Sequence, residues 1–154
     1  MFKKFILLIL LSLAISANAS ESQAIFSAEK KADFETTYKS VYAALEDNKY
    51  FVVLEPDIGA SIGRFGKNWD NYNQNKLERI KSMVFCNGWY ANKVSNVDPK
   101  FLALCPLRIT MTHKQGVTSV FFVRPDFVAK GSKAESVAKE LTQGVIEAIQ
   151  QGMK

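Results

Sequence analysis

The chain has 154 residues, a formal net charge of +5 at pH 7, two cysteines and one histidine. This length suits one domain with a sizeable apolar core, so folding does not depend on disulfides as it does in very small secreted domains. Its lysines are scattered along the sequence instead of forming a basic stripe, which argues against a nucleic-acid-binding protein. We therefore expect no nucleic-acid partner.

Residues 1–19 have the three parts of a cleavable export signal. Two lysines precede an apolar run at residues 5–15, and Ala17-Asn18-Ala19 is the small-x-small pattern that a signal peptidase cuts. The apolar run is shorter than the about 20 residues that a membrane-spanning helix needs. We predict cleavage after Ala19, which removes two lysines and lowers the formal charge from +5 to +3. The mature domain, residues 20–154, is then expected in the periplasm without membrane contact.

The first part of the mature chain predicts a helix and then a strand. Asp33 can cap the helix, because an aspartate side chain accepts hydrogen bonds from free N–H groups of the first turn. The apolar residues that follow recur at helical spacing. They are Phe34, Tyr38, Val41 and Leu45. Tyr50 to Leu54 is a short apolar run suited to a strand, and Pro56 ends it.

A second helix is predicted beyond this proline. Five apolar residues lie three or four positions apart, which places them on one helix face. They are Ile58, Ile62, Phe65, Trp69 and Tyr72. Three glycines between them, Gly59, Gly63 and Gly66, weaken the helix propensity. The stretch is therefore either a loosely packed amphipathic helix or a place where a backbone or ligand approaches closely.

The second half of the chain predicts a strand, a short helix, a β-hairpin and a long helix. The first strand is Arg79 to Cys86, and the short helix is Trp89 to Val97. The hairpin strands are Leu104 to His113 and Val117 to Val123, joined by a turn at residues 114–116. Ser132 and Glu135 have capping-box spacing before the last helix, and Gly152 lies near its end as a common terminator.

Together these elements predict a single α+β domain. We expect a curved, mostly antiparallel sheet that is packed on one face by the first and last helices. The opposite face of the sheet is either open or closed by a second subunit.

Five stretches in this order carry a family resemblance over roughly residues 30–150. They are "DFETTYKSVYAALEDNKYFVVLEPDIG", "MVFCN", "VDP", "LCPLRITM" and "VFFVRPDFVA". In this ordered set the chain resembles an exported member of the bacterial domain-of-unknown-function 302 family. Family members often have Asn-Pro where this chain has Asn87-Gly88, and residues 59–78 resemble an insertion. The resemblance implies a TATA-binding-protein-like α+β fold, often a homodimer, and no established activity or catalytic residue.

Cys86 and Cys105 are the two cysteines. In an oxidising compartment, a structural disulfide between them would close a loop of about twenty residues and stabilise the fold by about 3 kcal/mol. Three other interpretations stay open: independent thiols, a redox or sulfur-handling pair, and metal or haem ligation. Cys86 precedes a possible helix start, where a thiol pKa is lowered, but the sequence has no Cys-x-x-Cys pair.

His113, the only histidine, is expected to be an exposed surface residue beside the hairpin turn. It follows Cys105 by eight residues on one extended strand, about 26 Å at about 3.3 Å per residue, so the two do not share a metal ion. No nucleophile stands in a recognisable pattern with this histidine, and the sequence has no glycine-rich phosphate loop. We predict no catalytic set, no metal site and no cofactor.

Aromatic and basic residues are the candidates for ligand binding. Asn87, Trp89 and Tyr90 form a turn beside the first cysteine, and such residues line ligand clefts or subunit contacts. Arg108 and Arg124 belong to the hairpin strands, and we expect them on one sheet face as anion-binding groups.

The sequence therefore predicts an exported, non-catalytic binding or assembly module. Its partner is an unknown small ligand, a periplasmic protein or a second copy, with a homodimer formed through the sheet or hairpin. The alternative is a thiol-based redox or sulfur-handling protein that uses Cys86 and Cys105.

Overall fold

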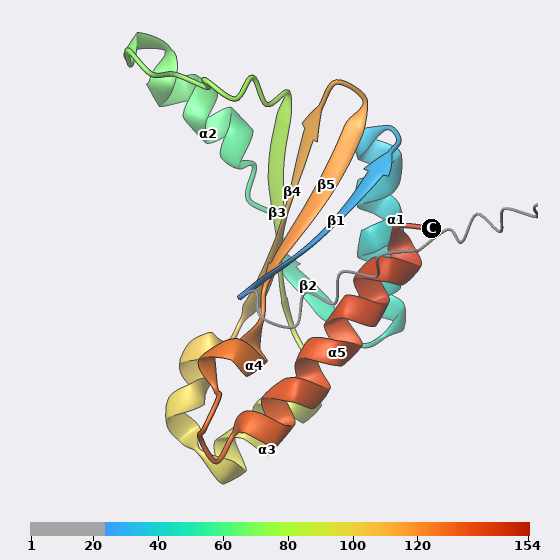
Figure 1. The fold of residues 1–154 in the computed structure, drawn as a ribbon, viewed down its shortest axis with the longest axis vertical. Helices are drawn as coiled ribbons and strands as arrows, with labels where there is room; N and C mark the ends of the chain where they lie inside the picture. The colour runs from blue at the N-terminus through green and yellow to red at the C-terminus, as the bar shows by residue number, and fades with distance from the viewer. Residues whose placement is uncertain (1–23) are drawn as a thin grey trace, which may run out of the picture.

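The computed structural model describes residues 24–154, so the predicted export signal and its cleavage site lie outside the described residues. The described residues form five strands, five α-helices and two 3₁₀ helices, whose arrangement is shown in Figure 1. Their bounds are β1 (Ile25–Lys31), α1 (Phe34–Asp47), β2 (Phe51–Leu54), α2 (Ile58–Phe65), η1 (Gly66–Asn68), β3 (Arg79–Cys86), α3 (Gly88–Val97), η2 (Pro99–Leu104), β4 (Leu107–Lys114), β5 (Val117–Val123), α4 (Pro125–Val128) and α5 (Glu135–Gly152).

The five strands form one sheet in the order β1-β5-β4-β3-β2, and every neighbouring pair is antiparallel. α1 and α5 pack against each other along one face of this sheet (Figure 1). Gln115 and Gly116 both have positive φ at the β4–β5 turn, as the predicted hairpin requires. The predicted α+β domain, with an antiparallel sheet packed by its first and last long helices, is confirmed.

Alternate side chains of the three central strands fill the space beneath α1 and α5, on what we call the covered face. None of these strand residues is more than 1% exposed. They are Met83, Phe85, Ile109, Met111, Val120 and Phe122. Apolar residues of both helices complete the core, including Val41 and Leu45 of α1 and Val145 and Ile149 of α5. Because side chains alternate along a strand, the residues between them point to the opposite face.

The two ends of α5 differ from the sequence prediction. The predicted capping box is wrong, because Ser132 Oγ donates to the Ala129 carbonyl while the Glu135 carboxylate accepts the Gly131 N–H at 2.7 Å. Gly152 is the last residue of α5 and has a packing role as well. A Cβ atom at this position would lie 2.5 Å from the Cα atom of Val41, so α1 and α5 pass each other at a distance that only glycine permits.

Residues 57–78, which we call the arm, project from the sheet on the side opposite α1 and α5 (Figure 1). α2 ends at Phe65, so the predicted helix is wrong beyond this residue. The chain instead turns back after η1, and two of the glycines lie where the backbone closely approaches other parts of the chain. A Cβ atom at Gly59 would lie 3.2 Å from the backbone nitrogen of Ile80, and one at Gly66 would lie 2.8 Å from the Trp69 ring. The glycines therefore permit close approach of the chain itself, one of the two alternatives that the sequence left open.

α3, η2 and α4 lie together at the other end of the sheet (Figure 1). α3 and η2 form the connection from β3 to β4, and α4 follows β5 directly. Among residues 24–154, the helices are all too short or too polar to cross a membrane.

Candidate functional site

The face of the sheet opposite α1 and α5, which we call the open face, carries a row of side chains that crosses all five strands. The strand register aligns Ile25 with Val123, Arg108 with Val84, and Val84 with Leu54. The β4–β5 register, continued by one pair, places Arg108 beside Val123. Leu54 is 61% exposed, Ile25 51% and Val123 48%, so this row is an apolar strip with an arginine at its centre.

Two phenylalanines extend the apolar strip. Phe121 precedes Val123 by two residues on β5, and Phe51 pairs with Cys86 at the end of β3. Both rings are more than one third exposed. Contiguous exposed apolar surface of this kind marks interaction sites more often than isolated exposed residues do.

Arg108 is the charged residue inside this strip. Among residues 24–154 it has neither a hydrogen bond nor an ion pair. Hydroxyl groups further along the open face bond to each other or to a carboxylate: Ser82 Oγ lies 2.8 Å from Thr110 Oγ1, and Ser119 Oγ donates to Glu29 at 3.0 Å. The Arg108 guanidinium therefore offers its N–H donors to a carboxylate or another planar anion that approaches the strip.

Arg124 is not beside Arg108, so the expected pair of arginines on one sheet face is wrong. Arg124 follows Val123 at the end of β5, and its guanidinium donates to Asp126 through Nε at 3.1 Å and through Nη2 at 2.7 Å. Burial opposes ionisation of Asp126, but hydrogen bonds with Arg124 and Thr142 outweigh it and lower the pKa of this carboxyl group. Arg124 thus binds the first turn of α4 through Asp126.

The three residues predicted to form a ligand-binding turn after Cys86 have different structural roles. Asn87 is the N-cap of α3, since its Oδ1 accepts the Tyr90 N–H at 3.2 Å. The Tyr90 ring stacks on Tyr50 with a centroid distance of 6.4 Å, and burial raises the pKa of Tyr90. Trp89 alone is largely exposed, with the ammonium of Lys93 over its ring.

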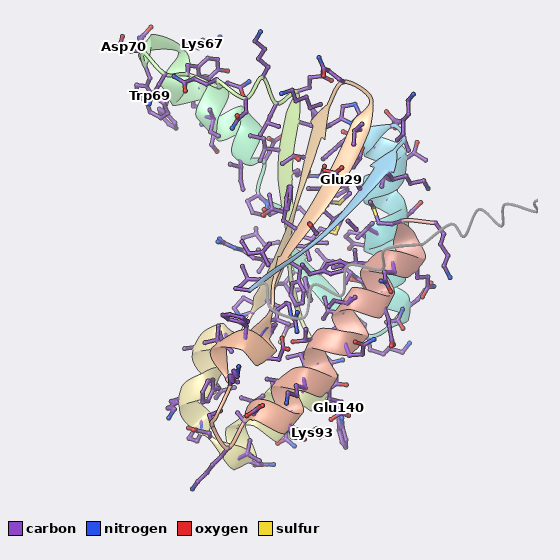
Figure 2. All side chains as sticks on the ribbon, viewed as in Figure 1. Glu29, Lys67, Trp69, Asp70, Lys93 and Glu140 are labelled. Carbon is purple, nitrogen blue, oxygen red and sulfur yellow. The ribbon has the colours of Figure 1, made fainter. Side chains whose placement is uncertain are left out.

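This turn also lies apart from Arg108 in the fold. Lys93, which contacts both Trp89 and Tyr90, forms an ion pair of 2.7 Å with Glu140 of α5 (Figure 2). The turn therefore packs toward the helical side of the molecule, whereas Arg108 lies on the open face of the sheet. The structure does not join the five predicted ligand residues into one site.

Cys86 and Cys105 are both free, so the predicted disulfide is not formed in the structure. Phe85 points into the core, and Cys86, the next residue, leaves the strand on the open face beside Phe51. Cys105 instead lines a small apolar pocket with Phe101 and Leu141. Cys86 is the last residue of β3, whereas Cys105 lies between η2 and β4, and the two thiols are near enough for Cys86 to influence the pKa of Cys105.

The chemistry of Cys105 follows from its position. Burial, and to a smaller extent the neighbouring Cys86, raise the pKa of the Cys105 thiol. A raised pKa lowers the thiolate fraction at neutral pH, and the thiolate is the nucleophilic form. The pocket is therefore unsuited to an activated cysteine.

His113 is not the exposed surface residue that we expected. Its side chain is 14% exposed, its Nδ1 lies 2.9 Å from Thr118 Oγ1, and its ring packs edge-on against Phe34. The Thr118 hydroxyl donates in turn to the Ala32 carbonyl. This chain of contacts joins the start of α1 to the hairpin, so His113 has a structural role. Among residues 24–154, no group of three or more His, Cys, Asp or Glu side chains is arranged to hold a metal ion.

The sequence predicted Arg108 as a candidate binding residue on a sheet face but not the apolar strip around it. One signal was present: β5 has apolar residues at both parities, with Val120 and Phe122 on one face and Phe121 and Val123 on the other. A strand that is apolar on both sides needs cover on both sides. The contributions of Ile25 and Leu54 depend on pairing between distant strands, which no local pattern encodes.

Comparisons with known proteins agree with this fold. The family model described as Domain of unknown function DUF302 matches residues 26–152. Among solved structures, the chain is similar to a crystal structure described as an uncharacterized conserved protein DUF302 from Bacillus stearothermophilus. The identity is 11% and the TM-score 0.74, and the alignment covers 86% of this chain and 100% of that chain, which shows a shared fold. No curated protein matches the chain.

Proposed function

Since the chain belongs to the family of Domain of unknown function DUF302, whose description names no activity, we propose a function from the geometry of its own surface. We propose that it is an exported, non-catalytic binding or assembly module that acts through the open face of its sheet. The observation that carries this proposal is Arg108, exposed and unpaired among the described residues, in the middle of the apolar strip.

The chemistry of the strip defines the class of group that it binds. Apolar side chains on both sides of Arg108 favour a ligand with an apolar body, because burial of apolar surface contributes about 25 cal/mol per Å². The guanidinium favours a carboxylate or sulfonate on that body, since a charge-assisted hydrogen bond contributes about 1.5 kcal/mol or more. An amphipathic anion, free or as part of a protein surface, meets both conditions.

Export is supported by the leader features of residues 1–19. Expression of the full chain in a Gram-negative host, followed by fractionation and intact-mass measurement, tests this part. We expect a periplasmic protein that begins at Ser20. A full-length chain in the cytosolic fraction would contradict export.

The binding surface is tested at a protein concentration too low for self-association, with the amphipathic anion 8-anilinonaphthalene-1-sulfonate, whose fluorescence reports apolar binding sites. We expect Arg108→Gln and Phe121→Ser to weaken binding of the probe by roughly tenfold, the effect of about 1.4 kcal/mol. Trp89→Ser is the matched control, since it removes an exposed aromatic ring from α3 and leaves the strip intact. Equal probe affinity in Arg108→Gln, Phe121→Ser and the unmodified chain, or weakening by Trp89→Ser alone, would overturn the proposal.

The thiol-based alternative has one favourable observation, which is that Cys86 and Cys105 are free neighbours. Against it, the pKa of Cys105 is raised by burial and by Cys86, the opposite of what an attacking thiol needs. The open face is therefore the better-supported site.

A further inference from the structure

The arm ends in apolar residues that its own chain leaves uncovered. Phe65 is 65% exposed, Trp69 55% and Tyr72 40%. Lys67 and Asp70 stand beside Trp69 at the end of the arm, pointing away from the body of the molecule (Figure 2). Neither charged residue has a hydrogen bond or ion pair among residues 24–154.

The arm is held in this position by its own packing. Asp57 caps α2 through a 2.7 Å hydrogen bond from the Ala60 N–H, and the rings of Trp69 and Tyr72 lie over Gly66. Asn73 closes the return by bonding both the N–H and the carbonyl of Leu77 at 2.9 Å. A surface that is preorganised in this way loses little conformational entropy when it binds.

We propose that the arm of a second copy covers the open face, and that the two copies exchange arms reciprocally. This inference rests on the proposed function, since it names the partner of the same surface. In a two-fold symmetric dimer, the arm of each copy lies on the strip of the other, so each chain supplies the cover that the other lacks.

The charges of the two surfaces are complementary. Asp70 stands next to the aromatic end of the arm, and Arg108 stands inside the apolar strip. Contact between the two surfaces brings a carboxylate to the unpaired guanidinium while the arm aromatics meet Val123, Leu54 and their neighbours. For Lys67 of the arm, the carboxylate on the same face is Glu29, four residues along β1 from Ile25, which also accepts the Ser119 hydroxyl.

The exposed apolar area matches what a stable dimer requires. Aromatic side chains bury about 150–250 Å² each, so the exposed parts of the three arm residues amount to roughly 300 Å². The strip exposes a similar area. Two arm-to-strip contacts then bury on the order of 1,200 Å² of apolar surface, and with a polar rim the interface reaches the usual size of about 1,600 Å².

Sedimentation of the mature chain is the first measurement. Interfaces of this size bind with micromolar or tighter dissociation constants, so we expect a dimer at about 100 µM. Trp69→Ser is expected to raise the dissociation constant by about a hundredfold, because buried tryptophans dominate interface energies. Trp89→Ser, the other exposed tryptophan, serves as the control and should leave the dimer unchanged. A monomeric mature chain at this concentration overturns the inference.

A charge exchange identifies the contact itself and leaves the packing of Trp69 and Tyr72 over Gly66 unchanged. Asp70→Arg alone and Arg108→Asp alone each place like charges together and should weaken the dimer by at least about tenfold. The double variant restores opposite charges in exchanged positions and should recover most of the affinity. Dimers that are unaffected by either single variant, or single defects that add up in the double variant, would overturn the inference.

The same variants separate this inference from the proposed function. If the chain is monomeric but binding of 8-anilinonaphthalene-1-sulfonate still requires Arg108, the open face is a binding surface and the arm is not its partner. If the arm variants abolish the dimer but Arg108→Gln binds the probe as tightly as the unmodified chain, arm exchange holds and the proposed binding of amphipathic anions is wrong. Binding of the monomeric chain to anionic lipid vesicles through Trp69 would likewise overturn arm exchange in favour of a membrane contact.

Discussion

The covered and open faces of the sheet are built from neighbouring residues of the same strands, but they differ in burial and in the contacts of their side chains. Phe122 is 1% exposed and packs under α1 and α5, whereas Phe121 is 38% exposed on the other face. Arg124 is bound by Asp126, whereas Arg108 has no partner among the described residues. Because strand side chains alternate, the residues of one face form the core and those between them are exposed on the other face. Substitutions at adjacent positions therefore test the two faces separately.

The largest expected difference is between the two adjacent phenylalanines of β5. Phe122→Ala should lower the free energy of unfolding by about 3–5 kcal/mol, because it removes a fully buried ring and leaves a cavity. Phe121→Ala should cost less than about 1 kcal/mol, since water already reaches that ring. Urea unfolding at low protein concentration measures both, because self-association then contributes little to stability.

Equal destabilisation by the two substitutions would contradict this division. That result would mean that the open face is covered within a single chain. Loss of probe binding in Phe122→Ala while the variant stays folded would also contradict it, since this ring belongs to the core.

The paired and unpaired arginines give a smaller expected difference. Asp126→Asn should lower the free energy of unfolding at pH 7 by about 2 kcal/mol, because it removes a charge-assisted contact with the Arg124 guanidinium. Arg108→Gln should change it by less than about 0.5 kcal/mol, since no contact is lost.

The pH dependence provides a second readout with a defined sign. The folded-state pKa of Asp126 is lowered, so the stabilisation is present above the ordinary aspartate pKa and is lost as the pH falls through the folded-state pKa. The stability difference between the unmodified chain and Asp126→Asn should therefore shrink below about pH 4. A difference that persists at lower pH would indicate that the substitution acts through packing instead of charge.

Local patterns accounted for most of the fold. α1 was predicted from the spacing of Phe34, Tyr38, Val41 and Leu45, and all four are buried. The hairpin followed from alternation on both sides of a glycine-containing turn. These elements are specified by residues close in sequence, so periodicity and turn chemistry suffice. Their packing as an α+β domain follows because the helices have one apolar face and the sheet needs cover.

The site was harder to predict because it depends on non-local register. The strip joins Ile25, Leu54 and Val123 only after five strands have paired in an order that differs from the sequence order. The arm was predicted as one helix because the spacing of its apolar residues continues past Phe65. Its return depends instead on ring packing over Gly66, which helical periodicity does not report.

The last expected difference is between the two thiols, and it concerns reactivity instead of stability. Iodoacetamide should add two alkyl groups to the unfolded, unreduced chain, since both cysteines are free. In the folded chain, Cys105 should react more slowly than glutathione, because its raised pKa lowers the thiolate fraction. Cys86→Ser should speed this reaction slightly, since the neighbouring thiol contributes to the shift. Time-resolved peptide mass spectrometry measures these rates, and a mass lower by two hydrogens that blocks alkylation would instead reveal the disulfide. Fast alkylation of Cys105 would revive the thiol-based function, because a reactive cysteine in an apolar pocket requires an activating group that its surroundings in this fold do not provide.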